Sequence, residues 1–206
     1  MKKWYQETMQ SGIEETMSTL QKSAVLKSFY LAGGTALALQ IGHRKSFDLD
    51  FFSQDFDENV VEEKVKTING FKLVKKETQT LHISIGKSKV SFLGYPYPLV
   101  FPYRFFNTVA IADVRDIAAM KMTAIANRGT KRDFFDLFTV AQLFSISELF
   151  EVFKSKFSKV NYSKNHVLRS LTYFNDAEDD VELKMLNNTS WQEVKAFFIK
   201  EVPKLS

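Results

Sequence analysis

The pattern of apolar and polar positions predicts strands and short helices in the first half of the chain and helices alone in the second. Apolar residues at every second position, or in short runs, predict strands over 29–32, 48–52, 71–76, 80–85, 89–93 and 107–111. Apolar residues three or four positions apart predict helices over 1–20, 36–41, 55–68, 113–128, 130–144, 145–157, 163–174 and 191–202. The expected fold class is therefore α+β. A mixed-sheet core over residues 1–112, with helices on one side, is joined to a helical domain over residues 113–206.

Two aspartates stand two positions apart on one predicted strand. Asp48 and Asp50 therefore point to the same face and place two carboxylates side by side. Two such charges repel each other unless a cation compensates them, and hard oxygen ligands suit Mg²⁺. A lone pair of this kind is more often a solvated strand edge, so its surroundings decide whether it is a metal site.

A glycine turn precedes this strand by one short helix. Gly33 and Gly34 lack side chains, and the helix that begins beside Thr35 directs free N–H groups and a partial positive charge at its start. A phosphate can approach such a backbone closely. A glycine pair alone is more often a plain strand-to-helix turn, but together with Asp48 and Asp50 it predicts a site that holds a triphosphate and its metal.

The helix predicted over 113–128 carries one lysine in an otherwise small and apolar sequence. Lys121 and Arg128 are seven positions apart and share a face. Lys121 is either a surface lysine whose stem covers apolar residues or a cation that reaches the phosphates. In the following segment, Thr130 and Asp133 fit a capping box, which does not explain Asp136.

The glycine turn and the aspartate pair together resemble the signature of the DNA polymerase β-like nucleotidyltransferase superfamily. The flanking words LAGGTALAL and DLDFFS are closer still to its AbiEii/AbiGii toxin branch, and the likeness extends from about residue 28 into the C-terminal third. Lys121 matches a lysine in a similar helix of that branch, and residues 131–137 resemble its R-D-x-x-D-L motif.

The resemblance implies a role for each matching residue. Asp48 and Asp50 would be catalytic residues that hold Mg²⁺, and Lys121 and Asp136 would complete the catalytic set. A nucleoside triphosphate would bind to the backbone turn and to cations, namely Gly33, Gly34, Thr35, Lys121, Arg128 and Arg132. The active site is expected in a cleft between the two domains.

One position departs from the superfamily pattern. A third carboxylate is usual on a strand after the aspartate pair, and the corresponding position here is Ser91. A hydroxyl is a weak Mg²⁺ ligand without charge. Either two carboxylates suffice, or Glu77 or another residue substitutes, or catalysis is weakened.

Composition narrows the setting without deciding the function. The 206 residues contain no cysteine, which excludes disulfides and thiolate metal sites and fits a cytoplasmic protein. The three histidines, His43, His82 and His166, are scattered and do not suggest a zinc site. The net charge of +4 permits an anionic partner. No apolar run is long enough to span a membrane. The acidic run 176–182 is expected to be a solvated loop.

The sequence thus predicts a Mg²⁺-dependent nucleotidyltransferase that moves a nucleoside monophosphate from an NTP to an acceptor hydroxyl. The resemblance implies a bacterial toxin of a toxin–antitoxin or abortive-infection system, with a tRNA end or a protein as acceptor and a cognate antitoxin as partner. Three alternatives stay open: a degenerate protein that binds nucleotide without transferring it, a metal-dependent nuclease, and an interaction protein with a vestigial site.

Overall fold

The computed structural model describes residues 3–205, and the chain divides into two compact units. Unit 1 is formed by Met1–Pro98 and Pro102–Asp113, and unit 2 by Leu99–Phe101 and Val114–Ser206. Each unit has its own secondary structure and its own buried residues, and each is described by itself.

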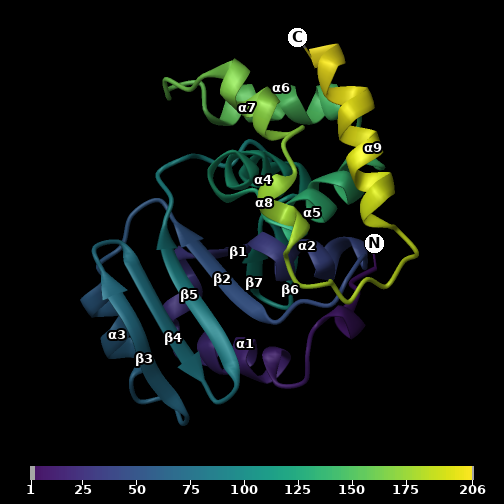
Figure 1. Ribbon diagram of the computed structural model, residues 1–206. Coiled ribbons are helices and arrows are strands. Elements are labelled where there is room, and N and C mark those ends of the chain that lie inside the picture. The colour runs from purple at the N-terminus through teal and green to yellow at the C-terminus, as the bar shows by residue number, and fades with distance from the viewer. Residues whose placement is uncertain (1–2, 206) are drawn as a thin grey trace. The chain divides into compact units, whose positions relative to one another are not determined.

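Unit 1 is built around a seven-stranded mixed sheet with the order β3-β4-β5-β2-β1-β7-β6 (Figure 1). The pairs β2–β5 and β1–β7 are parallel, and the other neighbours are antiparallel. The strands are β1 (Tyr30–Ala32), β2 (Asp48–Ser53), β3 (Phe71–Glu77), β4 (Thr80–Ile85), β5 (Ser88–Gly94), β6 (Arg104–Phe106) and β7 (Val109–Ile111). The α+β class and the mixed sheet are confirmed.

The strands predicted by alternation agree closely with the structure, and one was missed. β6 lies between the strands predicted over 89–93 and 107–111, where no strand was predicted, and it pairs with β7 at the edge. Three residues that directly follow a proline-containing stretch are too few to show a period of two, so the sequence pattern carries no signal for this strand.

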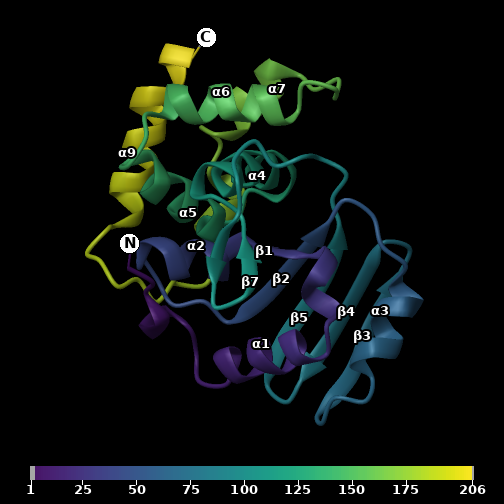
Figure 2. The ribbon, with the colours of Figure 1, turned by 180° about the vertical axis from the view of Figure 1, so that it is seen from behind.

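The sheet has one covered and one open face over β2, β5 and β4. Figure 2 shows α1 (Ile13–Lys22) and α3 (Glu58–Val65) over the covered face. Leu49, Phe51 and Phe92 are fully buried there, and Thr16 of α1 hydrogen-bonds to Ser88 of β5 at 2.9 Å. The polar residues that alternate with these apolar ones point to the opposite, open face.

The N-terminal helix is shorter than predicted. Instead of one helix over 1–20, the described part of this segment has a 3₁₀ turn, η1 (Gln6–Thr8), and then α1. Gly12, at φ +93°, directly precedes α1, a backbone conformation that glycine adopts without strain. The glycine therefore separates the two elements, and the amphipathic pattern concealed this boundary.

Unit 2 is helical throughout its ordered elements. They are α4 (Val114–Arg128), α5 (Lys131–Ala141), α6 (Ile146–Lys156), α7 (Lys164–Ser170), α8 (Asn175–Glu178), α9 (Trp191–Glu201) and η3 (Val202–Leu205). Rings pack its interior: Phe134 contacts Phe174, Trp191 and Phe198 at centroid distances of 5.2 to 5.7 Å. A capping box formed by Ser145 and Glu148 opens α6.

The acidic run 176–182 is largely exposed, as its charge suggested, but it is not a plain loop. Its first residues belong to α8, and the Asp180 carboxylate accepts the backbone N–H of Lys131 at 2.7 Å. The Lys131 ammonium donates to the carbonyls of Glu178 and Asp180. This segment thus caps the start of α5, where N–H groups lack helical partners.

Within the described residues, no helix is long and apolar enough to cross a membrane.

Candidate active site

The two predicted metal ligands lie on the open face of the sheet. β2 alternates between half-buried and buried residues, so Asp48 and Asp50 are half-exposed while Leu49 between them is fully buried. Two residues along a strand are about 6.6 Å apart. The buried residues on the other side anchor β2, and the carboxylates share the open side.

The glycine turn meets this carboxylate pair directly. β1 pairs with β2 so that Ala32 lies across from Asp50, and α2 (Gly33–Ile41) begins at the next residue. Gly33 has φ +72°, and a Cβ built on it would lie 3.0 Å from Asp50 Oδ2. A side chain at Gly33 would therefore be strained by its backbone and would press on the carboxylate.

Thr35 fixes the turn to the start of β2. Its hydroxyl is buried, donates to the backbone carbonyl of Asp48 and hydrogen-bonds with the Ser46 hydroxyl at 2.8 Å. These contacts hold the N-terminal turn of α2 beside the aspartate pair. Thr35 thus positions the backbone N–H groups that a phosphate would meet.

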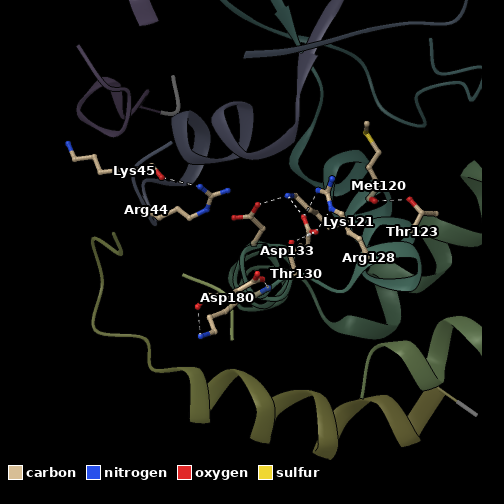
Figure 3. Close-up of polar contacts among 11 residues, drawn as sticks. Arg44, Lys45, Met120, Lys121, Thr123, Arg128, Thr130, Asp133 and Asp180 are labelled. Atoms are coloured by element: carbon tan, nitrogen blue, oxygen red, sulfur yellow. Dashed lines mark hydrogen bonds and ion pairs between the residues drawn. The ribbon is translucent and has the colours of Figure 1, made fainter. Parts of the chain in front are cut away.

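A cation also lies against the same turn. The guanidinium of Arg44 occupies the space that a side chain at Gly34 would need, and its Nη1 donates to the Lys45 carbonyl at 3.0 Å (Figure 3). Arg44 is 5% exposed, so its charge is held in place. Arg44 was not singled out from the sequence, because its approach to Gly34 depends on how the loop after α2 folds back on that helix.

Ser91, the position at which the resemblance places a third carboxylate, lies directly beside Asp50 in the strand register. β5 runs parallel to β2, and Asp50 and Ser91 are direct partners across the two strands. Cross-strand partners point to the same face, so Ser91 faces the same side as the aspartate pair. Glu77, the suggested substitute, lies on β3, which is separated from β2 by β4 and β5. It is therefore not placed beside Asp50.

The donor set fits Mg²⁺. Among the described residues, no group of three or more His, Cys, Asp or Glu side chains is placed to hold a metal ion. Mg²⁺ is commonly bound by one or two carboxylates together with substrate phosphates and water. Asp48 and Asp50, half-exposed and beside a glycine that leaves space next to Asp50, meet that requirement with oxygen ligands alone.

The second group of predicted residues forms an ion-pair cluster within unit 2. Lys121 Nζ lies 2.7 Å from Asp133 Oδ1 and 2.7 Å from Asp136 Oδ2, and both carboxylates are fully buried. Arg128 Nε donates to Asp133 at 2.8 Å, and the Thr130 hydroxyl donates at 2.6 Å. In Figure 3 the side chains of Lys121, Arg128 and Thr130 surround Asp133.

This cluster decides two of the alternatives about its residues. Lys121 is 6% exposed, so it is not a surface lysine that extends over apolar residues. The Thr130 side chain makes no capping hydrogen bond to the start of α5 and instead donates to Asp133, so the predicted capping box is wrong. Asp133 is thus a member of the ion-pair cluster, whereas Arg132 is exposed on the same helix.

The charges of the cluster determine the protonation of Asp133. Burial alone would raise the pKa of this carboxyl, but the ammonium of Lys121 and the guanidinium of Arg128 outweigh burial and hold the pKa well below its usual range. Asp133 is therefore an anion at any physiological pH. It holds two cations of α4 in fixed positions, Lys121 from the middle of the helix and Arg128 from its last residue.

The structure places the predicted site residues in two groups. The turn residues Gly33, Gly34 and Thr35 lie with Asp48 and Asp50 in unit 1. Lys121, Arg128 and Asp136 lie with Asp133 in unit 2. Two residues near the first group had no assigned role: Arg44, and His82, whose Nδ1 is 3.0 Å from Ser91 Oγ. The position of His82 on a polar strand face was visible in the sequence, but its neighbours were not.

Three comparisons relate the chain to known proteins. It is 33% identical over 195 residues to an uncharacterized protein of Aquifex aeolicus, with 91% of this chain and 93% of that protein covered. Its fold is similar to JHP933 from Helicobacter pylori, with a TM-score of 0.53, 21% identity, and 93% and 91% of the two chains covered.

It is also similar to MenT4, a nucleotidyltransferase toxin from Mycobacterium tuberculosis, with a TM-score of 0.56, 16% identity, and 92% and 84% covered. Residues 15–204 match the family described as nucleotidyl transferase AbiEii toxin, Type IV TA system. That match takes in both the glycine turn with its aspartate pair and the helical unit. The chain therefore belongs to the AbiEii nucleotidyltransferase toxin family.

Proposed function

We propose that this protein uses Mg²⁺ to transfer a nucleoside monophosphate from a nucleoside triphosphate to an acceptor hydroxyl. The observation that carries the proposal is the meeting of two features. The carboxylates of Asp48 and Asp50 share one face of β2, and the turn that opens α2 lies against one of them, with Asp50 Oδ2 3.0 Å from where a Cβ of Gly33 would be.

Each residue of this group has a defined part in the proposed reaction. Asp48 and Asp50 would hold the metal, which when bound polarises the α-phosphorus and neutralises the phosphate charge. The N–H groups at the start of α2, fixed by Thr35, would bind the β- and γ-phosphates. Arg44, held against Gly34, would add a cation to the same end of the triphosphate.

The ion-pair cluster of unit 2 is proposed to act on the phosphates as well. Lys121, Arg128 and Arg132 would neutralise the charge that develops as pyrophosphate leaves. Asp136 would orient Lys121, whose ammonium it contacts at 2.7 Å. A phosphate would bind Lys121 in competition with two buried carboxylates, so its contribution is expected to be larger in the transition state than in the ground state.

The acceptor and the partner are proposed from the family alone. A toxin-like role implies a tRNA end or a protein side chain as acceptor and a cognate antitoxin as binding partner. The net charge of +4 permits an RNA acceptor without requiring one.

A transfer assay tests the proposal. The protein is incubated with Mg²⁺, each α-labelled nucleoside triphosphate in turn, and a mixture of total tRNA and cell protein. We expect label on RNA or on protein with the wild type and none with the Asp48→Ala/Asp50→Ala double variant. Equal labelling by both proteins would overturn the assignment of the carboxylate pair.

A protein that binds nucleotide without transferring it is the second candidate, because Ser91 stands where a third carboxylate is usual. That candidate predicts no label from the wild type but a nucleotide-dependent rise in thermal stability, since a ligand that binds only the native state stabilises it. The same two experiments therefore separate the candidates.

A further inference from the structure

The open face beside the aspartate pair carries a hydrogen-bonded serine and histidine. His82 Nδ1 lies 3.0 Å from Ser91 Oγ. β4 and β5 pair so that these two residues are direct partners, and Ser91 is in turn the direct partner of Asp50. One row across the sheet therefore runs from Asp50 through Ser91 to His82.

The row is accessible rather than part of the core. Asp50, Ser91 and His82 are each half-exposed, whereas Val90 and Phe92 on either side of Ser91 are buried on the covered face. The hydrogen bond is thus not needed to satisfy two buried polar groups. Since neighbouring strands are about 4.8 Å apart, Ser91 is close enough to Asp50 to contact a substrate held there.

The charges that face His82 come from three strands. Lys75 on β3 is its direct partner on the side away from Ser91, and it is ion-paired with Glu77 at 3.0 Å. Beyond Ser91 and along the neighbouring strands the same face carries Asp50, Lys89 and Lys72. Both signs of charge, Asp48 included, therefore lie on the face that His82 occupies.

We propose that Ser91 and His82 take up the proton of the acceptor hydroxyl, in place of the missing third carboxylate. This inference rests on the proposed nucleotidyl transfer. The acceptor oxygen forms a bond to the α-phosphorus, and the bond from that phosphorus to the bridging oxygen of pyrophosphate breaks. The proton of the acceptor moves to Ser91 Oγ while the proton of Ser91 moves to Nδ1 of His82. Pyrophosphate leaves with the electron pair of the broken bond.

The geometry requires a particular tautomer. His82 must carry its proton on Nε2 for Nδ1 to accept from Ser91, and the 3.0 Å separation fits that hydrogen bond. Ser91 touches the substrate in this scheme and His82 acts through Ser91. His82 is therefore a positioning and proton-accepting residue rather than a residue in contact with the reacting atoms.

The test compares initial rates of labelling for the wild type, His82→Gln and Ser91→Ala, with α-labelled triphosphates, Mg²⁺, and total tRNA with cell protein as acceptors. Each variant is expected to lose a factor of about 10² to 10⁴, the usual contribution of a general base. The double variant should lose no more than either single variant, because the two residues act as a unit. His166→Gln, which alters an exposed histidine of α7, should keep the wild-type rate.

Two further readouts distinguish proton transfer from a structural effect. The pH profile of the wild-type rate should differ from that of His82→Gln, because only the wild type has an imidazole that accepts the proton. Ser91→Asp should restore activity to His82→Gln, because a carboxylate at residue 91 accepts the proton directly. Stabilisation by Mg²⁺ and nucleotide should be unchanged in His82→Gln.

Three outcomes would overturn the inference. An active wild type with a His82→Gln rate within about twofold of it, or with an unchanged pH profile, would refute the relay and leave the proposed function intact. Failure of Ser91→Asp to rescue a folded His82→Gln variant would likewise count against it. A wild type that labels no acceptor would overturn the proposed function and the relay together.

Discussion

Replacing Asp48 with asparagine separates the metal function of the carboxylate pair from its effect on stability. The two charges are about 6.6 Å apart, so their repulsion is about 2.5 kcal/mol at an effective dielectric constant of 20 and about 0.6 kcal/mol in water. Lys89 lies directly across from Asp48 on β5 and offsets about 0.2 to 1 kcal/mol of this. Without ligand, Asp48→Asn should therefore leave the free energy of unfolding unchanged or raise it by up to about 2 kcal/mol.

The response to ligand should change in the opposite direction. A nucleotide with Mg²⁺ at 100 times its Kd stabilises the wild type by about 2.7 kcal/mol, which raises the Tm of a chain of this size by roughly 5 to 11 °C. Asp48→Asn should lose this rise, because a neutral amide does not replace a carboxylate as a ligand of Mg²⁺. Thermal unfolding followed by circular dichroism, with and without Mg²⁺ and each nucleotide, measures both effects.

A matched variant controls for the loss of one negative charge. Glu63→Gln removes a carboxylate from the exposed surface of α3, where it pairs with Lys66, and should keep the full ligand-dependent rise. Two results would refute the reasoning. A ligand-dependent rise that persists in Asp48→Asn would show that this carboxylate does not hold the metal. An unliganded variant less stable by more than about 1 kcal/mol would show that the pair is not a strained, repulsive arrangement.

Three other predictions follow from the cluster in unit 2 and from the register of β5. Lys121→Met should weaken nucleotide binding and should destabilise the fold by about 3 to 5 kcal/mol, because it removes the cation between two buried carboxylates. Lys156→Met, which removes the partner of buried Asp116, should destabilise the fold similarly without affecting nucleotide binding. Isothermal titration of each folded variant with nucleotide measures the binding. Asp133→Asn should flatten the acid dependence of the urea midpoint: the pKa of Asp133 is held low in the folded state, so its stabilisation is present above about pH 4 and is lost as pH falls toward the folded pKa. Ser91→Asp should preserve or raise Mg²⁺ affinity, and a lower affinity in a folded variant would contradict its placement beside Asp50.

The parts of the site that the sequence predicted are local in the chain. The strand, turn, helix and strand that bring Gly33 to Asp50 span fewer than 25 residues, and each has its own signal in residue type or period. Alternation along β2 was enough to place Asp48 and Asp50 on one face, because a strand has a strict period of two.

The parts that the sequence did not predict depend on partners far away in the chain. Asp116 lies in the first turn of α4, yet its buried carboxylate accepts the N–H groups of Val100 and Phe101 and pairs with Lys156. Asp180, in a segment expected to be solvated, caps α5 through Lys131. Nothing in the local pattern of an acidic residue indicates which distant N–H group it will accept, so these contacts emerge only when the helices pack.

Two buried lysines of unit 2 show how a structural lysine differs from the one proposed to bind phosphate. The side chains of Lys156 and Asp116 are both fully buried, and one ammonium pairs with one carboxylate. The Asp116 carboxylate also accepts a hydrogen bond from the backbone N–H of Val100. Lys121 instead lies between two carboxylates, Asp133 and Asp136, and Asp133 recruits Arg128 as a second cation. A purely structural ion pair gains little from a second buried carboxylate, since each buried charge costs several kcal/mol of desolvation. Two carboxylates fix the direction of the ammonium more firmly than one, and a cation that stabilises phosphate charge, most of all in the transition state, benefits from being fixed beforehand. The difference between Lys121→Met and Lys156→Met in nucleotide affinity, at similar losses of stability, therefore measures the part of this cluster that serves the reaction.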